Sequence, residues 1–231
     1  MAPLKNNHSG ATMNTRRNAL YAALLGLAGS TLLIVSGCAT PPPAADRMAI
    51  SPMGTVLTYH RKSSGSLGTY DGQVVWTHAP ATWQGQPVIA FGAPQAGVAL
   101  HDPASFAIRA MLSADGKPVM AFDPPIDYAW PLAVGKTWST QYAVTLFPSG
   151  NQVPFKRDFK VEGIEDVTVP AGTFKTWKLS WKDSTGETET RWLSPAQGIA
   201  TVKRHVERPA THAQGPGVLD AELLSRMLPA K

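Results

Sequence analysis

The sequence predicts a mainly β fold: an antiparallel meander that forms either a two-sheet sandwich or a curled sheet, an open or closed barrel, with a short C-terminal helix. Three observations predict this fold class. Short β-rich segments recur between turn signals, and 20 glycines and 20 prolines interrupt the 231-residue chain. No alternation of strand and helix patterns occurs, so a parallel sheet is not expected. All seven tryptophans and all seven phenylalanines lie beyond residue 37, which supplies a packed core.

Strand signals begin in the first half of the chain. The β-rich segments there are 55–60, 73–77 and 87–91. Residues 105–112 and 119–122 flank the dipeptide Asp115-Gly116, which tolerates the positive φ angles of a tight turn. These two segments therefore predict a β-hairpin.

Strict alternation marks the strands of the second half. Trp138 and Tyr142 share one face of a predicted strand, and Ser139 and Gln141 share the other. One face of this strand should point to a core and the other to water. A second alternating strand follows, and Gly163 predicts a bulge or bend in it.

A tight turn is predicted at Pro170-Ala171-Gly172. Proline presets φ at the first corner of a turn, and glycine can adopt a left-handed conformation at its exit. Trp177, Leu179 and Trp181 then alternate with polar residues, as in another strand with one buried face.

The C-terminal tail predicts a short helix. Leu219, Leu223, Leu224 and Met227 have helical spacing, and Asp220 lies near the start of this segment.

The N-terminal segment has the pattern of an export signal. Arg16 and Arg17 precede an uncharged apolar run over residues 19–35, and small residues follow it. The run is 17 residues long, which is shorter than the ~20 residues of a membrane-spanning helix. An export signal is therefore expected rather than a transmembrane helix.

Val35-Ser36-Gly37-Cys38 resembles the lipobox of bacterial lipoproteins. The resemblance implies that Cys38, the only cysteine, becomes the N-terminus and is acylated, so that the partner of the mature protein is the lipid bilayer. Several acyl chains anchor a protein stably, whereas one does so only marginally. Ala39 stands where an aspartate would resemble an inner-membrane retention signal. The resemblance thus implies the outer membrane, facing the periplasm.

These observations divide the chain into four parts. We expect 1–37 to be a lipoprotein signal peptide, 38–50 the lipidated cysteine with a proline-rich tether, 51–208 a single β-rich domain, and 209–231 a tail with the short helix. Met13 is an alternative start, and Arg16-Arg17 leaves general secretion and twin-arginine export both open.

The charge of the mature chain gives no reason to expect nucleic-acid binding. The full chain carries a formal charge of +5, but Lys5, Arg16 and Arg17 lie in the predicted signal, so +2 remains. A nucleic-acid partner calls for a basic patch or stripe.

Residues 131–204 resemble a recurring pattern of uncharacterised β-rich envelope proteins and lipoproteins of bacteria. The pattern's most specific piece is Val-Pro-Ala-Gly-Thr-Phe, residues 169–174. The resemblance implies a β-sheet fold and an exported location, and it implies no reaction and no catalytic residue.

Sequence motifs for catalysis or metal binding are absent. The chain has neither a Gly-x-Ser-x-Gly elbow, a phosphate loop, nor a His-Glu-x-x-His motif. No catalytic residue, metal ligand or cofactor is therefore predicted. Asp102, Asp123 and Asp127 are the best acidic candidates, but each lies beside a proline or near a strand end, where aspartate commonly caps a turn.

Tryptophans are the remaining candidates for a site. Trp138, Trp177, Trp181 and Trp192 could line an apolar ligand cavity, or they could fill the core.

We therefore expect a membrane-anchored envelope lipoprotein of non-enzymatic type. It would bind a small apolar or amphipathic ligand, or another envelope protein. Two alternatives stay open: an envelope hydrolase that uses the aspartate carboxylates, and a structural or assembly subunit that pairs through an exposed edge strand.

Overall fold

The computed structural model describes residues 44–93 and 97–230. Its elements in these ranges are β1 (Val56–Gly65), β2 (Tyr70–Trp83), β3 (Gln86–Ala93), β4 (Gly97–His101), β5 (Ile108–Leu112), β6 (Pro118–Ile126), β7 (Thr137–Leu146), β8 (Gln152–Val169), β9 (Gly172–Asp183), β10 (Thr188–Ser194), the 3-10 helix η1 (Pro195–Gln197), β11 (Ile199–Arg208) and β12 (Gly217–Met227). The predicted signal peptide and Cys38 lie outside the described residues.

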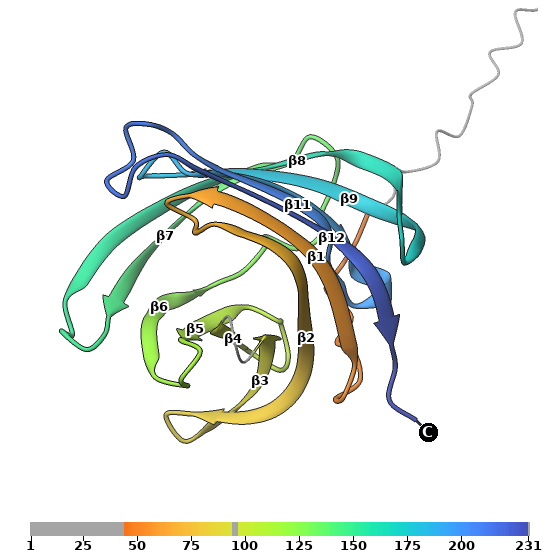
Figure 1. Cartoon of the computed structure of the whole chain (residues 1–231), viewed down its shortest axis with the longest axis horizontal. Helices are drawn as coiled ribbons and strands as arrows, with labels where there is room; N and C mark the ends of the chain where they lie inside the picture. The colour runs from red at the N-terminus through yellow and green to blue at the C-terminus, as the bar shows by residue number, and fades with distance from the viewer. Residues whose placement is uncertain (1–43, 94–96, 231) are drawn as a thin grey trace, which may run out of the picture. The chain divides into compact units, whose positions relative to one another are not determined.

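The twelve strands of the described residues form one antiparallel sheet that closes into a barrel. Each strand pairs with its neighbours in sequence, and β1 pairs with β12 to complete the ring. Figure 1 shows β8, β9, β11, β12 and β1 side by side as a broad curved sheet, from which β2 bends toward β3. The mainly β composition agrees with the prediction. The closure excludes two of the predicted alternatives, the sandwich and the open barrel, and leaves the closed barrel.

The predicted C-terminal helix is also wrong, because the tail forms strand β12. This strand pairs with β1 on one side and with β11 on the other. Leu219 and Leu223 are buried while Asp220 is exposed, as period two requires, and Leu224 is partly buried at a shift in the β1–β12 register. Hydrogen bonding to two neighbouring strands outweighs a helical spacing of leucines, which is only a local preference. The residues described contain no helix long and apolar enough to cross a membrane.

Local turn and bulge signals are confirmed. Gly172 has a φ of +128° and starts β9 directly after the turn at Pro170-Ala171. Asp115-Gly116 lies in the turn between β5 and β6, where Gly116 has a φ of +76°. The register of β8 against β9 shifts between Val161 and Gly163, which is the predicted irregularity.

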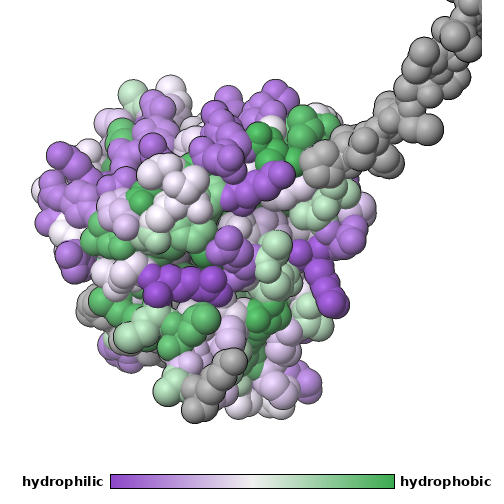
Figure 2. All heavy atoms as spheres, turned by 90° about the vertical axis from the view of Figure 1, so that its right-hand side faces the viewer, coloured by the Kyte–Doolittle hydropathy of each residue, from purple (hydrophilic) through white to green (hydrophobic). Residues whose placement is uncertain are grey.

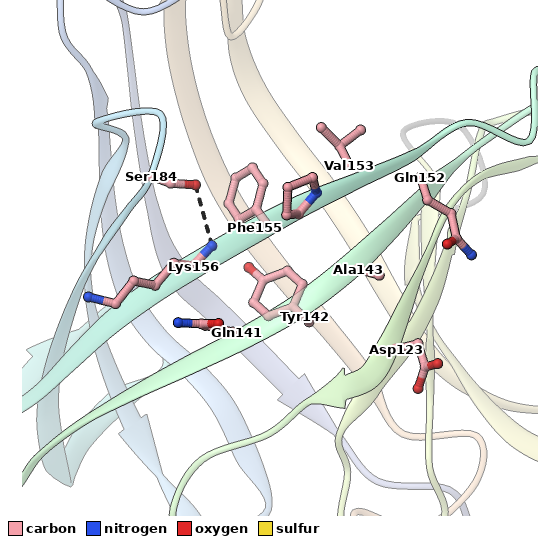
Figure 3. A pocket seen from close by; sticks show the side chains of 10 residues that line it. Asp123, Gln141, Tyr142, Ala143, Gln152, Val153, Phe155, Lys156 and Ser184 are labelled. Carbon is pink, nitrogen blue, oxygen red and sulfur yellow. Dashed lines mark hydrogen bonds between the residues drawn. The ribbon is translucent and has the colours of Figure 1, made fainter.

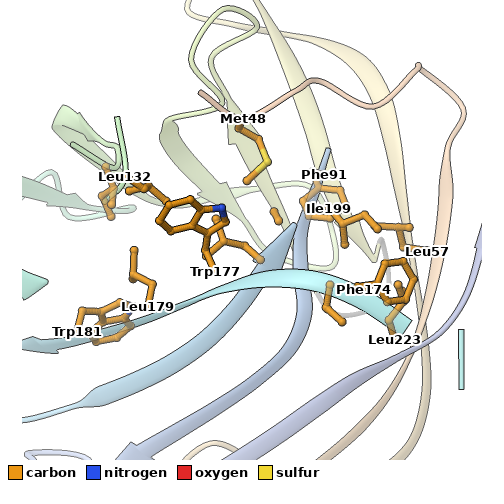
Figure 4. Close-up of a cluster of buried hydrophobic side chains, with 14 of the residues drawn as sticks. Met48, Leu57, Phe91, Leu132, Phe174, Trp177, Leu179, Trp181, Ile199 and Leu223 are labelled. Atoms are coloured by element: carbon orange, nitrogen blue, oxygen red, sulfur yellow. The ribbon is translucent and has the colours of Figure 1, made fainter. Parts of the chain in front are cut away.

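Buried apolar side chains fill the barrel. Figure 4 shows part of the main cluster, in which Trp177 and Trp181 from β9 lie near Leu132 and Leu179. A second, smaller cluster consists of Val88, Leu100 and Ala110 on β3, β4 and β5.

The segment before β1 packs onto the barrel. Met48 is 3% exposed and belongs to the main core. The Ala49 amide donates to the Pro195 carbonyl at 3.0 Å. Gly198 follows η1 with a φ of +67°, and a Cβ there would lie 2.8 Å from the Ala49 carbonyl oxygen. Residues 44–50, which fall in the predicted tether, are thus in contact with the β domain.

Polar and apolar side chains mix on the outer surface. Figure 2 shows hydrophilic and hydrophobic residues interspersed over one face of the barrel. Exposed large apolar side chains include Leu146 on β7 and Val153 on β8.

Candidate functional site

The pairing between β6 and β7 is short. Only Met120–Asp123 pairs with Ala143–Leu146, in four residue pairs. Pro124 and Pro125 follow Asp123 in β6 and have no N–H group to continue the ladder. Among the described residues, the part of β7 from Thr137 to Tyr142 therefore pairs with β8 alone.

The direction of the backbone groups identifies which residues of β7 face the open side. The Leu146 amide donates to Asn151 on the β8 side at 2.9 Å, and the Phe147 amide donates to Val119 on the β6 side at 3.0 Å. Successive residues of a strand direct their N–H and C=O groups to alternate sides. Counting back from Phe147 therefore assigns Thr137, Ser139 and Gln141 to the open side.

These three residues form what we call the free edge of β7. All three are exposed. A six-residue strand segment is about 20 Å long, enough to pair with an extended peptide. An exposed strand edge of this kind is a template for pairing with another chain.

A hollow of about 570 Å³ lies beside the free edge. Figure 3 shows Tyr142 and Gln141 of β7, Phe155 and Lys156 of β8, and Asp123 of β6 around it. The Tyr142 and Phe155 rings stack with centroids 5.5 Å apart. The volume of the hollow falls in the range of roughly 300–1,000 Å³ that is typical of ligand sites.

The hollow combines an apolar wall with polar rims. Val153, which lines it, is 41% exposed, and Leu146 on the neighbouring strand is 38% exposed. Burial raises the pKa of Tyr142, whose hydroxyl is enclosed and has no hydrogen-bond partner in the described residues. Lys156 lies 2.8 Å from Asp158 in an exposed ion pair on β8. Apolar contact and a few polar groups could thus bind an extended or amphipathic partner, but the arrangement suggests no bond-making chemistry.

The structure does not bring the four predicted tryptophans together. Trp177 and Trp181 are 8% and 7% exposed in the main core. Trp138 packs against that core and stacks on Phe159 at a centroid distance of 4.8 Å. Trp192 lies between Lys178 and Lys203, whose ammonium groups are 5.2 Å and 5.5 Å from its ring. None of these four rings lines the hollow beside the free edge of β7.

Two of the three predicted carboxylates have turn or ion-pair roles. Asp102 accepts backbone hydrogen bonds from its own turn and pairs with Arg109 at 2.5 Å. Hydrogen bonding from Arg109 lowers the pKa of Asp102 to about 2. Asp127 accepts from the Tyr128 amide at 2.7 Å, and burial raises its pKa. These opposite shifts suit an acid and base pair, but neither carboxylate lines a described hollow.

Of the three predicted acids, only Asp123 lines the hollow beside the free edge of β7. Residues 44–93 and 97–230 hold no group of three metal-binding side chains.

The free edge itself was not predicted from the sequence. Its one sequence signal is Pro124-Pro125 within a β-forming segment, which marks a place where ladder pairing must stop.

Comparisons with known proteins find distant structural similarity. No protein-family model and no curated protein matches the chain. A candidate lipoprotein of Parabacteroides distasonis is 11% identical with a TM-score of 0.44, over 79% of this chain and 99% of that one. A candidate exported protein of Bacteroides fragilis with a YmcC-like fold is 13% identical with a TM-score of 0.44, over 79% and 100%. The hypothetical lipoprotein YmcC of Escherichia coli is 9% identical with a TM-score of 0.40, over 77% and 85%. These similarities are too weak to carry an argument about function.

Proposed function

We propose that this chain is a lipid-anchored, non-enzymatic protein of the bacterial cell envelope that docks an extended segment of another envelope protein. The segment adds a strand to the free edge of β7 and covers the hollow next to it. The anchor is acylated Cys38, and the protein faces the periplasm from the outer membrane.

The proposed localisation of the protein rests on its N-terminal sequence. The basic and apolar run before Val35-Ser36-Gly37-Cys38 suits an exported precursor that is processed at the cysteine. Multiple acyl chains hold a protein at a bilayer stably. A partner that is reached from this position is itself a component of the envelope.

The free edge of β7 is the main observation in support of the docking role. Thr137, Ser139 and Gln141 direct their backbone groups away from β8, and pairing with β6 stops at Asp123. Unpaired backbone groups on an edge give affinity to an added strand, and side-chain hollows next to the edge give specificity. Tyr142 and Phe155 supply such a hollow.

Site-specific photo-cross-linking in the host cell tests this role. A benzoylphenylalanine probe replaces Gln141, and the control probe replaces Lys182, an exposed residue of β9, which pairs on both sides. We expect one discrete adduct with another envelope protein from position 141 and none from position 182. Introducing Ser139→Pro removes an edge N–H without removing a β7–β8 hydrogen bond, so the adduct should be lost. Ser139→Ala keeps that N–H and should retain the adduct.

Two results would contradict the proposal. One is an adduct at position 141 that persists at full yield with Ser139→Pro. The other is the absence of any adduct specific to position 141. An adduct between two copies of this chain would instead support the assembly-subunit alternative.

A further inference from the structure

Three arginines from neighbouring strands occupy matching register positions in the barrel wall. Arg191 of β10 lies opposite Arg204 of β11, Arg204 lies opposite Ala221 of β12, and Ala221 lies opposite Arg61 of β1. Tyr59 is two residues before Arg61 and is 1% exposed in the main core. Residues two apart share a face of a strand. The three guanidinium groups therefore form a row on the inner face of the barrel.

One carboxylate contacts this row. Glu189 is 2% exposed and lies 2.5 Å from Arg191 Nε and 3.0 Å from Arg204 Nη2. Burial lowers the pKa of Arg204, and the like charge of Arg191 adds to this effect, while Glu189 opposes it. Arg191 and Arg204 share the single carboxylate of Glu189, so two positive charges face one negative charge and one positive charge is in excess.

Arg61 lies farther along the row and has no charged partner in the described ranges. Its Nη2 donates to the Leu67 carbonyl oxygen at 3.2 Å, and its Cζ lies 5.9 Å from the centre of the Tyr70 ring. Its Nε is buried and makes no hydrogen bond within residues 44–93 and 97–230. A half-buried guanidinium without a counter-ion is costly, because it loses hydration that no carboxylate replaces.

A small hollow adjoins this guanidinium. Its volume is about 170 Å³, and it lies between β1 and β2. Its lining residues are Arg61, Ser63, Leu67, Gly68, Thr69, Tyr70 and Val74. Ser63 is 5% exposed, and its hydroxyl is a second enclosed donor without a partner in the described part of the chain. A buried donor left unpaired costs free energy that a bound acceptor would recover.

We propose that this hollow binds one phosphoryl group, held by the Arg61 guanidinium and the Ser63 hydroxyl. A guanidinium fork matches the oxygen geometry of phosphate, and its charge strengthens the hydrogen bonds. The excess positive charge of the arginine row favours a doubly charged anion over a singly charged one. The volume is below the ~300 Å³ of a typical site for a whole ligand, so a single group fits.

This site is independent of the proposed docking at β7. It is built on β1 and β2, and no residue of the free edge lines it. The phosphoryl group can come from free phosphate or from the phosphomonoester head group of a lipid, and both sources present terminal phosphoryl oxygens.

Titration calorimetry on the full protein, purified from its host in an uncharged detergent, tests the site with inorganic phosphate. We expect Arg61→Gln to weaken binding by about tenfold or more, because the charged donor is lost. The matched control is Lys62→Gln, which removes the same charge one residue away from a side chain that is 70% exposed. We expect Lys62→Gln to change the Kd by less than about twofold, since exposed charges are screened.

A second arm with dihexanoyl-phosphatidic acid, whose head group is a phosphomonoester, distinguishes the sources. Tighter binding of this lipid than of phosphate, again weakened by Arg61→Gln, assigns the site to a lipid head group. Equal or weaker binding of the lipid assigns it to free phosphate. The proposal is overturned if the unmodified protein binds neither probe, or if Arg61→Gln and Lys62→Gln weaken binding equally.

Folding of the variants is followed by thermal unfolding. Arg61→Gln removes an uncompensated charge, so its midpoint in phosphate-free buffer should not fall. If it does fall, Ser63→Ala provides the test, because it removes one unpaired donor and no charge. Ser63→Ala should weaken phosphate binding while leaving the midpoint in phosphate-free buffer unchanged, and unaltered binding by this variant would overturn the proposal.

Discussion

At the scale of single residues, His78 and His101 show how burial controls charge inside the barrel. His78 stacks on Phe91 at 4.3 Å, and His101 stacks on Phe106 at 4.0 Å. Burial is the largest cause of a lowered pKa in both, to about 4 from the usual 6.5. Both imidazoles are therefore neutral in the folded protein near pH 7.

We predict that the barrel loses stability as pH falls from 6.5 toward 4. The unfolded chain binds protons on these histidines near pH 6.5, whereas the folded protein binds them only near pH 4. Stability from their burial is thus complete above pH 6.5, and the loss approaches about 1.4 kcal/mol per pH unit for each histidine. Urea unfolding at pH 7, 6 and 5 measures this slope.

His78→Gln should reduce that slope by about half, because one of the two buried groups no longer titrates. The control is His212→Gln, in the connection between β11 and β12, which leaves both buried imidazoles in place. An unfolding free energy that is the same at pH 7 and pH 5 would contradict the burial of neutral histidines. Asp102, with a pKa of about 2, affects the pH dependence of the unfolding free energy only below the pH range of this experiment.

Residue-level rules predicted the features that depend on local chemistry. The turn at Pro170-Ala171-Gly172, the turn at Asp115-Gly116 and the irregularity at Gly163 all follow from what proline and glycine allow the backbone to do. The arginine row could not be predicted in the same way. It depends on the registers of four strands, of which β1 lies far in the sequence from β10, β11 and β12, and a single-residue shift would turn Arg61 to the outer face.

At the scale of elements, β12 shows where local preference gives the wrong structure. Its leucines have the spacing of a helix face, but Leu219, Ala221 and Leu223 also have the period of a strand. β12 pairs with β1 on one side and with β11 on the other. The stabilisation from these two sets of ladder hydrogen bonds exists only in the closed barrel.

Alanine substitutions at adjacent leucines distinguish the two structures of this tail. Leu223 is fully buried in the main core, so Leu223→Ala should cost about 2–5 kcal/mol of unfolding free energy. Leu224 is only partly buried and is skipped where the register of β1 against β12 shifts, so Leu224→Ala should cost less than about 1.5 kcal/mol. Chemical denaturation measures both. Equal losses would suit a helix that buries both leucines and would contradict the strand.

At the scale of the whole molecule, the pairing between β6 and β7 is one of the places where the described barrel wall is weakly paired. β6 leaves β7 at Pro124-Pro125, and the free edge of β7 results. The sequence signals predicted a β domain and the residues of β7, because periodicity is a property of one segment. They could not predict the free edge, because an edge is defined by which strand is missing beside it.

The proposed anchor and the proposed docking surface belong to different parts of the chain. The anchor is proposed from the lipobox-like sequence Val35-Ser36-Gly37-Cys38, and the contact surface from β7 in the described residues. The hydrolase alternative gains little from the structure, since Asp102 and Asp127 are engaged in turns and only Asp123 lies at the hollow.

Residue-by-residue hydrogen exchange of the purified protein, followed by NMR, tests the free edge most directly. The amides of Thr140 and Tyr142 bond to β8, so they should be strongly protected, whereas those of Ser139 and Gln141 should exchange at nearly unprotected rates. We expect this alternation between protected and unprotected amides. Equal protection of all four amides would contradict it, because the edge would then already be paired and no strand could be added there.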